Sequence, residues 1–269
     1  MVVRTRDERR RRARRPPRRR CLSGARRRTV TAGWRLLDER HSARDAAAQM
    51  ARDVALLDEV TAGAAPALRF YQWRPPALSL GRFQPLDDVD IGACERHGVG
   101  VVRRPTGGRA LLHGGDLTYA IVFPVPPGPR PSVDALYRWV AAGLIAGLAR
   151  LGVDAHIARH DGPAGPACFA TQQGADLRVG DRKLCGSAQL RRRGVVLQHG
   201  SVLLDRLAID ETDLLHAEHD SRGLQAATVT LAELGVDDDA SAVVEALRDG
   251  FRAALGLEFS SIADSSISS

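Results

Sequence analysis

The 269-residue chain contains no asparagine and only one lysine, Lys183, although it carries 39 lysine and arginine residues in total. When nearly every base is arginine, a retained lysine favours a need for an ammonium group, a compact charge that guanidinium does not reproduce. Chance is the alternative explanation, and the neighbouring residues argue against it. Gly180-Asp181 predicts a hairpin turn before the lysine, and Gly186 after it predicts a bulge or a close backbone approach by a ligand.

Other absences narrow the class of protein. No apolar run approaches the length of a membrane span, and the chain starts without the apolar stretch of a secretory signal. The four cysteines, at positions 21, 94, 168 and 185, form no CxxC pair and no metal-binding spacing. We therefore expect a cytoplasmic protein with reduced thiols, without a metal site and without a membrane partner.

Basic charge is concentrated at the start of the chain. Residues 1–28 hold fourteen arginines against Asp7 and Glu8, a net charge of +12, so that residues 29–269 carry −5 of the formal total of +7. A nucleic-acid-binding fold needs a basic face of its own, which this distribution does not require, and we expect no nucleic-acid partner. Residues 1–33 are predicted to be a disordered arginine-rich tail, either a transit peptide or the product of a miscalled start codon.

Apolar periodicity predicts a single α+β domain over residues 34–258, with helices packed on a mixed sheet, followed by a polar tail at 259–269. Strands are expected at 34–37, 67–73, 77–80, 100–104, 116–123, 153–157, 175–179, 182–190 and 195–204. Helices are expected at 43–60, 87–97, 132–151, 210–216, 228–234 and 240–255, with Ser132 as the cap of the long helix at 132–151.

A glycine-rich stretch runs from Arg103 to Gly115. Gly107 and Gly108 allow the backbone to approach an anionic or extended ligand, and Arg103 and Arg104 suit a phosphate or carboxylate. A glycine-rich turn with solvated arginines explains the same residues. The spacing matches neither the P-loop nor the dinucleotide-binding motif.

Cys168 lies among prolines and small residues in Gly-Pro-Ala-Gly-Pro-Ala-Cys-Phe-Ala-Thr. Such a setting holds a thiol without crowding it, which suits a nucleophile that a substrate must reach. A small buried hydrophobe is the equally weighted alternative. His199, beside Gly200 and Ser201, is expected to be a hydrogen-bonded structural histidine.

Together, four motifs resemble the lipoate/octanoate branch of the biotin- and lipoate-protein ligase superfamily, over roughly residues 34–255. The motifs are Ser79-Leu-Gly-Arg-Phe-Gln84, Arg103-Arg-Pro-Thr-Gly-Gly-Arg-Ala-Leu-Leu-His113, Arg182-Lys-Leu-Cys-Gly-Ser-Ala-Gln189 and Leu197-Gln-His-Gly-Ser-Val-Leu-Leu204. The biotin-ligase GRGRxGR motif is absent. Cys185 stands where the family commonly has an aliphatic residue, and the stretch 81–84 lacks the asparagine of some ligases.

The resemblance implies a biotin/lipoate ligase-type catalytic domain and assigns roles to residues. Lys183 would contact the acyl carbonyl, and Cys168 matches the nucleophile of the cysteine-dependent octanoyltransferases. The substrate-binding residues would be Arg103, Arg104, Gly107, Gly108, His113, Gly186, Ser187 and Ala188. No general base is assigned, and His113 is the best candidate among the histidines.

The activity implied is octanoyl transfer from octanoyl-acyl carrier protein, through a Cys168 thioester, to a lysine of a lipoyl domain of a 2-oxoacid dehydrogenase or of the glycine cleavage H protein. No cofactor is expected, because exchange between thioesters is nearly isoenergetic and amide formation is downhill. The alternatives are an ATP-dependent lipoate ligase, an octanoyl transfer between two lipoyl domains, and a non-catalytic acyl-binding protein. Arg191-Arg192-Arg193 is the predicted docking patch for the acidic carrier protein, with a solvated hairpin tip as the alternative.

Overall fold

The computed structural model describes residues 33–42, 44–126, 128–158, 176–216, 225–237 and 239–260. All of these residues lie in one compact unit, Ala32–Ser269. Residues 1–32 of the tail predicted at 1–33, and the predicted nucleophile Cys168, lie outside the described residues.

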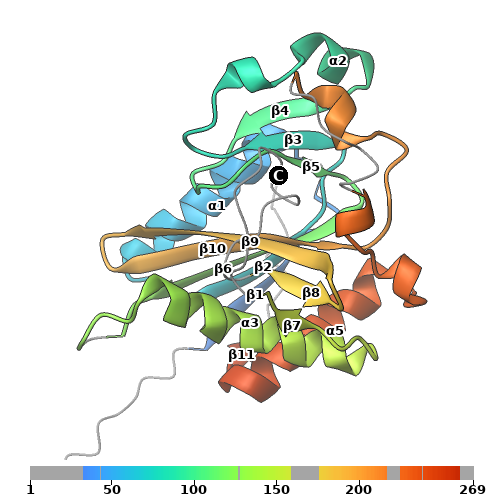
Figure 1. The fold of residues 1–269 in the computed structure, drawn as a ribbon. Helices are drawn as coiled ribbons and strands as arrows, with labels where there is room; N and C mark the ends of the chain where they lie inside the picture. Colours follow the sequence, from blue (N-terminus) through green and yellow to red (C-terminus); the bar gives the residue numbers. More distant parts are fainter. Residues whose placement is uncertain are drawn as a thin grey trace, which may run out of the picture. The chain divides into compact units, whose positions relative to one another are not determined.

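Two sheets form the framework (Figure 1). Within the described ranges, the larger has eight strands in the order β11-β1-β2-β6-β10-β9-β8-β7, and the smaller has three in the order β4-β3-β5. The larger sheet consists of β1 (Trp34–Asp38), β2 (Ala67–Tyr71), β6 (Asp116–Pro124), β7 (His156–Ile157), β8 (Leu177–Val179), β9 (Arg182–Arg192), β10 (Val195–Leu203) and β11 (Phe259–Ser260). The smaller consists of β3 (Ala77–Leu80), β4 (Gly100–Arg103) and β5 (Leu111–His113).

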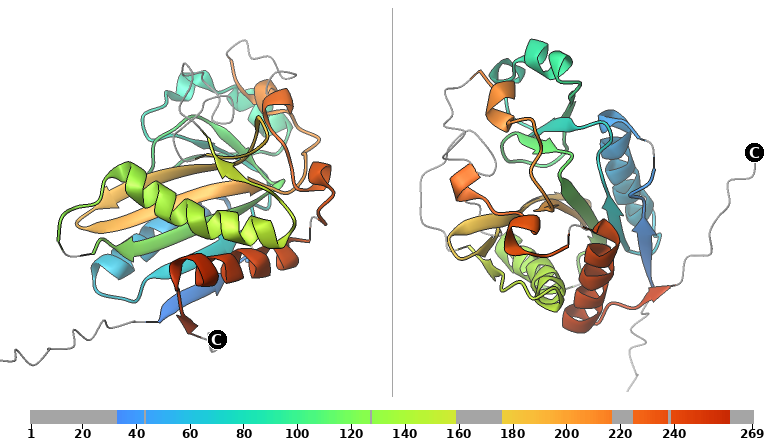
Figure 2. Two further views of the ribbon diagram at one scale, coloured as in Figure 1. Left: turned by 60° about the horizontal axis from the view of Figure 1, so that its bottom comes forward. Right: turned by 90° about the vertical axis from the view of Figure 1, so that its right-hand side faces the viewer.

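Helices cover both faces of the larger sheet (Figures 1 and 2). Helices α3 (Val133–Arg150) and α5 (Ala240–Leu255) pack together on one face, and α1 (Ala46–Thr61) packs on the other. The alternation of β6 explains this arrangement, because Leu117, Tyr119 and Ile121 join the core under α3 and α5, while Ala120 and Val122 join the core under α1. The smaller sheet packs with the short helix α2 (Ile91–Arg96) in a third apolar cluster.

Most of the predicted elements are present, with ends that differ by a few residues. The strand at 77–80 and the helix at 240–255 have the predicted bounds, and Ser132 caps α3 by accepting a hydrogen bond from the Ala135 amide at 3.0 Å. The segment at 153–157 is a strand only at His156–Ile157. A short 3-10 turn at Leu86–Asp88 precedes α2, which starts four residues later than predicted.

Three predictions need correction. The helix predicted at 228–234 is wrong, because Thr228 forms a β-bridge with Lys183 and the Leu231 amide binds the Leu203 carbonyl, which leaves only a 3-10 turn at Ala232–Leu234. The short helix predicted at 210–216 is a 3-10 turn, Glu211–Leu214. The polar tail predicted from residue 259 begins as strand β11, since Phe259 and Ser260 pair with the edge strand β1.

Candidate functional site

A cavity lies between the two sheets and takes its walls from both of them. We call it the His113 cavity. Its lining residues are Met50, Tyr71, Trp73, Ser79, Arg104, Leu111, His113, Thr118, Gly186, Ser187, Ala188, His199, Gly200 and Ser201. Helix α1 and strands β2, β3, β5, β6, β9 and β10 therefore all contribute to it, although they are widely separated in sequence. A largely apolar cavity with a few converging polar groups is typical of a small-molecule site.

His113 is held from both ring nitrogens. Its Nδ1 lies 3.0 Å from Asp116 Oδ2, its Nε2 lies 2.8 Å from Ser79 Oγ, and its ring stacks on Trp73 with centroids 4.3 Å apart. Burial alone would raise the pKa of the Asp116 carboxyl, but the charge and hydrogen bond of His113 outweigh it and hold that pKa below its usual value. His113 and Asp116 flank the turn by which the chain passes from β5 to β6, so that this pair joins the two sheets.

His199 repeats this arrangement on the opposite wall. Its Nδ1 lies 3.0 Å from Asp53 Oδ2 and its Nε2 lies 2.6 Å from Thr106 Oγ1. Asp53 also accepts a hydrogen bond from the Tyr71 hydroxyl at 3.0 Å and forms an ion pair with the fully buried Arg69 at 2.7 Å. Despite burial, the hydrogen bond from His199 and the charge of Arg69 lower the pKa of Asp53. The expectation of a hydrogen-bonded His199 is confirmed.

Lys183 is buried in strand β9, with 1% of its surface exposed. Its Nζ forms an ion pair with Asp176 Oδ2 at 2.8 Å, and Asp176 is buried as well. A Cβ added at Gly186 would lie 3.1 Å from Lys183 Cε and 3.2 Å from Nζ. The glycine therefore gives the lysine side chain room to lie along its own strand, beside the cavity that Gly186 lines.

The bulge predicted at Gly186 is wrong. Gly186 pairs in regular register with Ser201 of β10, and the irregularity in this sheet lies between Leu177 and Arg178 of β8. The alternative interpretation, a glycine beside a ligand, is compatible with its place in the cavity wall.

Arg103 and Arg104 organise the glycine-rich stretch. The exposed Arg103 donates through Nη1 to the Gly81 and Gln84 carbonyl oxygens at 2.8 and 2.5 Å. The buried Arg104 donates to the Ser79, Gly107 and Arg109 carbonyl oxygens at 2.7 to 3.1 Å and lines the His113 cavity. A Cβ at Gly81 would lie 1.9 Å from the Gly108 carbonyl oxygen, which explains why these two segments meet at glycines.

The cavity thus gathers Arg104, His113, Gly186, Ser187 and Ala188 of the predicted binding residues. Gly107 and Gly108 belong to the loop that Arg104 holds by a hydrogen bond to the Gly107 carbonyl oxygen, and Gly107 is exposed. Sequence reasoning missed several residues that hold the site together: Asp53, Tyr71, Trp73, Asp116, Asp176 and Glu211. Of these, only Asp116 carried a signal, since His-Gly-Gly-Asp places two polar groups on either side of a turn.

Cys185 lies two residues from Lys183 and is fully buried in the main core. Burial and, secondarily, the charge of Asp176 raise the pKa of its thiol to about 12. It therefore remains protonated and packs as a small apolar side chain.

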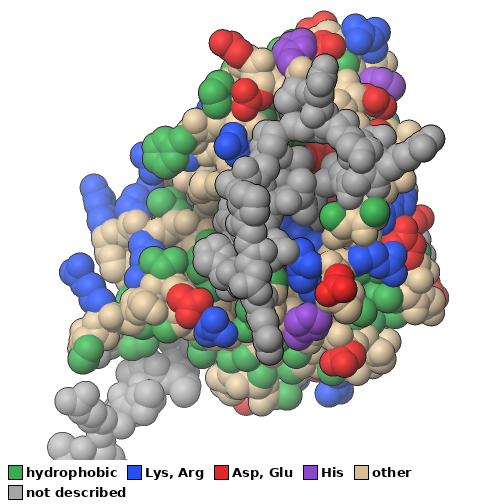
Figure 3. Space-filling view, in the orientation of Figure 1, with side chains coloured by type: hydrophobic (Ala, Val, Ile, Leu, Met, Phe, Trp, Pro, Cys, Tyr) green, Lys and Arg blue, Asp and Glu red, His purple; other side chains and the backbone are tan. Residues whose placement is uncertain are grey.

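A groove with a basic rim adjoins the His113 cavity through Met50 and Arg104, which line both. Arg82, Arg103, Arg191 and Arg192 also line the groove, whose floor includes apolar residues of α1. Figure 3 shows Lys and Arg side chains gathered at the left edge of the molecule, on the side where the β9–β10 hairpin ends. Arg191 and Arg192 already have partners within the protein. Arg191 donates hydrogen bonds to the Pro131 and Ser132 carbonyl oxygens, and Arg192 forms an ion pair with Asp58.

The described ranges contain no group of three or more histidine, cysteine or acidic side chains placed to hold a metal ion. Among the helices in these ranges, none combines the length and the apolar character that crossing a membrane requires.

Comparison with known proteins connects this site to a family. A model of the lipoyl protein ligase A/B catalytic domain matches residues 45–252. An octanoyltransferase LipM of Kyrpidia tusciae is 42% identical over 242 residues, covering 83% of this chain and 87% of that protein. An octanoyltransferase LipM of Staphylococcus aureus is 39% identical over 194 residues, covering 68% of this chain and 69% of that protein.

Solved structures share the fold. A lipoate-protein ligase A bound with ATP superimposes with a TM-score of 0.73 at 24% identity, covering 86% of this chain and 88% of that one. The putative lipoate protein ligase Ta0514 of T. acidophilum gives a TM-score of 0.70 at 25% identity, with coverage of 86% and 88%. The predicted α+β domain of the lipoate-ligase type is therefore confirmed.

Proposed function

Since the chain belongs to the lipoyl protein ligase A/B catalytic domain family, we propose that it transfers an octanoyl group from octanoyl-acyl carrier protein, through a thioester on Cys168, to a lysine of a lipoyl domain. Octanoyltransferase activity itself follows from relatives named octanoyltransferase LipM that are 36 to 43% identical. The donor, the acceptor and the covalent route are the proposed parts.

The observation that carries the proposal is the buried Lys183 ammonium beside the His113 cavity. In acyl transfer, negative charge develops on the carbonyl oxygen, and a fixed cation in a site of low dielectric constant stabilises it. The ion pair with Asp176 at 2.8 Å and the space left by Gly186 fix the position of that cation before substrate arrives.

The reaction follows from the groups proposed. The Cys168 thiolate attacks the donor thioester, its bond to the acyl carbon forms, and the donor thiolate leaves and takes a proton. The acceptor amine then attacks the new thioester, an amide forms, and the Cys168 thiolate is released. Neither step needs ATP, so no cofactor is proposed.

For docking, we propose that the acidic carrier protein meets the basic-rimmed groove. Met50 and Arg104 line both the groove and the His113 cavity, so that a carrier protein docked on the groove would lie next to the cavity proposed for the acyl chain. The acceptor is proposed as a lipoyl domain, in keeping with a related structure described as a bipartite lipoate protein ligase and its E2 lipoyl domain.

The test is intact-protein mass spectrometry after mixing the enzyme with octanoyl-carrier protein, without ATP and without acceptor. A single octanoyl adduct that maps to Cys168, absent in Cys168→Ala and retained in Cys185→Ala, supports the proposal. Without an adduct, acceptor modification that requires ATP and free octanoate would establish a ligase. Modification that requires an octanoylated lipoyl domain as donor would establish transfer between lipoyl domains.

A further inference from the structure

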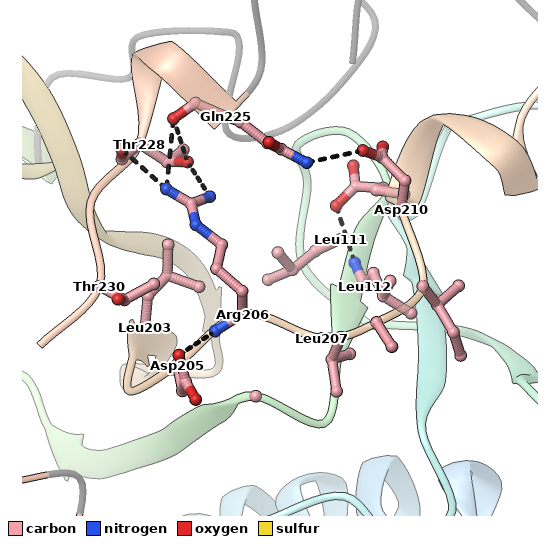
Figure 4. Close-up of a pocket in the computed structure, with 14 residues that line it drawn as sticks. Leu111, Leu112, Leu203, Asp205, Arg206, Leu207, Asp210, Gln225, Thr228 and Thr230 are labelled. Carbon is pink, nitrogen blue, oxygen red and sulfur yellow. Dashed lines mark hydrogen bonds between the residues drawn. The ribbon is translucent and has the colours of Figure 1, made fainter. Parts of the chain in front are cut away.

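A second cavity, which the proposed mechanism does not use, adjoins the first. It is open to solvent, holds about 150 Å³ and is lined by β5 and by the segments that follow β10 (Figure 4). We call it the Glu211 cavity, and its walls come from Leu111, Leu112, Gly115, Leu203, residues 205–211, Gln225, Thr228 and Thr230. Leu111 lines both cavities, so that they share a wall.

The Glu211 cavity lies against the strand that carries the lysine. Thr228, one of its lining residues, forms the β-bridge with Lys183, and the Val229 amide donates to the Lys183 carbonyl oxygen at 2.9 Å. The Glu211 cavity therefore lies against the backbone of Lys183, and the charge of Lys183 is close enough to act on Glu211.

The charges that line the cavity are predominantly negative. Among the described residues that line it, Asp205, Asp210 and Glu211 face one basic residue, Arg206. Figure 4 shows the Arg206 side chain turned toward Gln225 and Thr228, and its guanidinium is bound to Glu233 at 2.8 Å and to Thr228 Oγ1 at 2.7 Å. The cavity consequently favours a cation and disfavours the phosphates of a nucleotide.

Glu211 has an unused hydrogen-bonding atom. The side chain is buried, with 7% of its surface exposed, and its Oε2 accepts a hydrogen bond from the Leu112 amide at 2.9 Å, drawn as a dashed line in Figure 4. The other oxygen, Oε1, is also buried and makes no hydrogen bond within the part of the chain that the structure describes. A buried polar atom left without a partner is costly, and a ligand that donates a hydrogen bond removes that cost.

Burial raises the pKa of the Glu211 carboxyl to about 7, and the nearby charge of Asp210 adds to the effect. The hydrogen bond from Leu112 and the positive charges of Lys183 and Arg104 act in the opposite direction and are outweighed. A carboxyl group with this affinity exchanges its proton readily near neutral pH, which is the property of an effective general base.

We propose that the Glu211 cavity admits a primary alkylammonium, the side chain of the acceptor lysine, and that Glu211 Oε1 takes its proton. This inference rests on the proposed function. The ammonium gives one proton to the Glu211 carboxylate and becomes a neutral amine. The amine nitrogen bonds to the acyl carbon, the carbon–sulfur bond breaks, and the released cysteine thiolate takes the second proton from nitrogen. Glu211 then returns its proton to solvent.

The experiment separates the two half-reactions and uses Glu211→Gln, which keeps the acceptor for the Leu112 amide. The matched control is Asp213→Asn, an exposed carboxylate in the same 3-10 turn. Each protein is first acylated with an octanoyl thioester, and the octanoyl-enzyme is then mixed with a lipoyl domain or with hydroxylamine. Hydroxylamine is uncharged at neutral pH and needs no base.

We expect Glu211→Gln to form the octanoyl-enzyme within about 2-fold of the wild-type rate and to transfer it to the lipoyl domain roughly 100-fold more slowly at pH 7. Its reaction with hydroxylamine stays at the wild-type rate, and Asp213→Asn resembles the wild type throughout. The transfer rate of the wild type should level off above a midpoint near pH 7, whereas that of Glu211→Gln should rise up to the amine pKa of about 10.4.

The proposal is overturned if Glu211→Gln transfers the octanoyl group to the lipoyl domain at the wild-type rate. It is also overturned if the variant reacts with hydroxylamine as much more slowly than the wild type as it reacts with the lipoyl domain. If the variant does not fold, the wild-type pH profile decides alone, and a rise that continues to about pH 10 contradicts a base of this kind. Failure of the wild-type protein to form any octanoyl adduct overturns the thioester route, which is a separate result, and removes the basis of this proposal.

Discussion

The two cavities differ in how completely their polar groups are paired. In the His113 cavity each histidine binds a carboxylate through Nδ1 and a hydroxyl through Nε2, so that both side chains are fixed. In the Glu211 cavity one buried carboxyl oxygen is left without a partner among the described residues. Paired groups give a rigid wall of defined shape, while the buried Glu211 carboxyl, with its pKa raised to about 7, gains and loses a proton near neutral pH. The first arrangement suits recognition, and the second suits chemistry.

Lys183 lies between the cavities, and its replacement is expected to have the largest effect. Lys183→Met removes the ammonium from the buried Asp176 carboxylate, which should lower the free energy of unfolding by about 3 to 5 kcal/mol and abolish octanoyl transfer. Denaturant unfolding and a transfer assay measure the two effects.

The double variant Lys183→Met/Asp176→Asn separates them. It should recover most of the stability, because no ionised carboxylate stays buried opposite the methionine, and remain inactive. Recovery of activity in the double variant would show that Lys183 has only a structural role.

Glu211→Gln tests the unpaired side of the comparison through stability. The pKa of Glu211 in the folded protein, about 7, lies above its ordinary value of 4.5, so its contribution to stability is fully present below pH 4.5 and lost as the pH rises through 7. Relative to the wild type, the variant should therefore gain stability between pH 5 and 8, by up to about 3 kcal/mol. A stability difference that does not change with pH would contradict the raised pKa.

His113→Phe tests the paired side, where the pH dependence has the opposite sign. Phenylalanine keeps the stacking on Trp73 but leaves Asp116 and Ser79 without the ring nitrogens, which should cost about 2 kcal/mol. Because His113 lowers the pKa of Asp116, the loss should be greatest above about pH 4, where Asp116 is ionised, and shrink in acid. Unfolding curves at several pH values measure it, and a loss that grows in acid would refute this account.

Arg191, Arg192 and Arg193 lie outside both cavities, so reversing their charges should have the smallest effect on transfer. We expect the KM for octanoyl-carrier protein to rise about 3- to 10-fold at low salt, with no change toward a small octanoyl thioester. The effect should fade as ionic strength rises, because exposed charges are screened. An equal change for both donors would remove this end of the hairpin from the docking surface.

Local patterns predicted most of the elements because their signals are short-range. The periodicity of α5, the cap at Ser132 and the turn at Gly180-Asp181 each depend on residues a few positions apart. The failure at 228–234 has the opposite cause. Thr228 pairs with Lys183, 45 positions earlier in the chain, and that pairing overrides the local preference for a helix.

The sequence by itself determined the family and the α+β class and singled out Lys183 as a candidate residue, because motif residues and a unique lysine can be recognised without coordinates. Only the tertiary structure decided which groups meet that lysine and its cavity. Asp53 reaches His199 across 146 positions, and Glu211 reaches the Leu112 amide across 99. Burial, which raises the pKa of Glu211, arises only when distant segments pack together and exclude water.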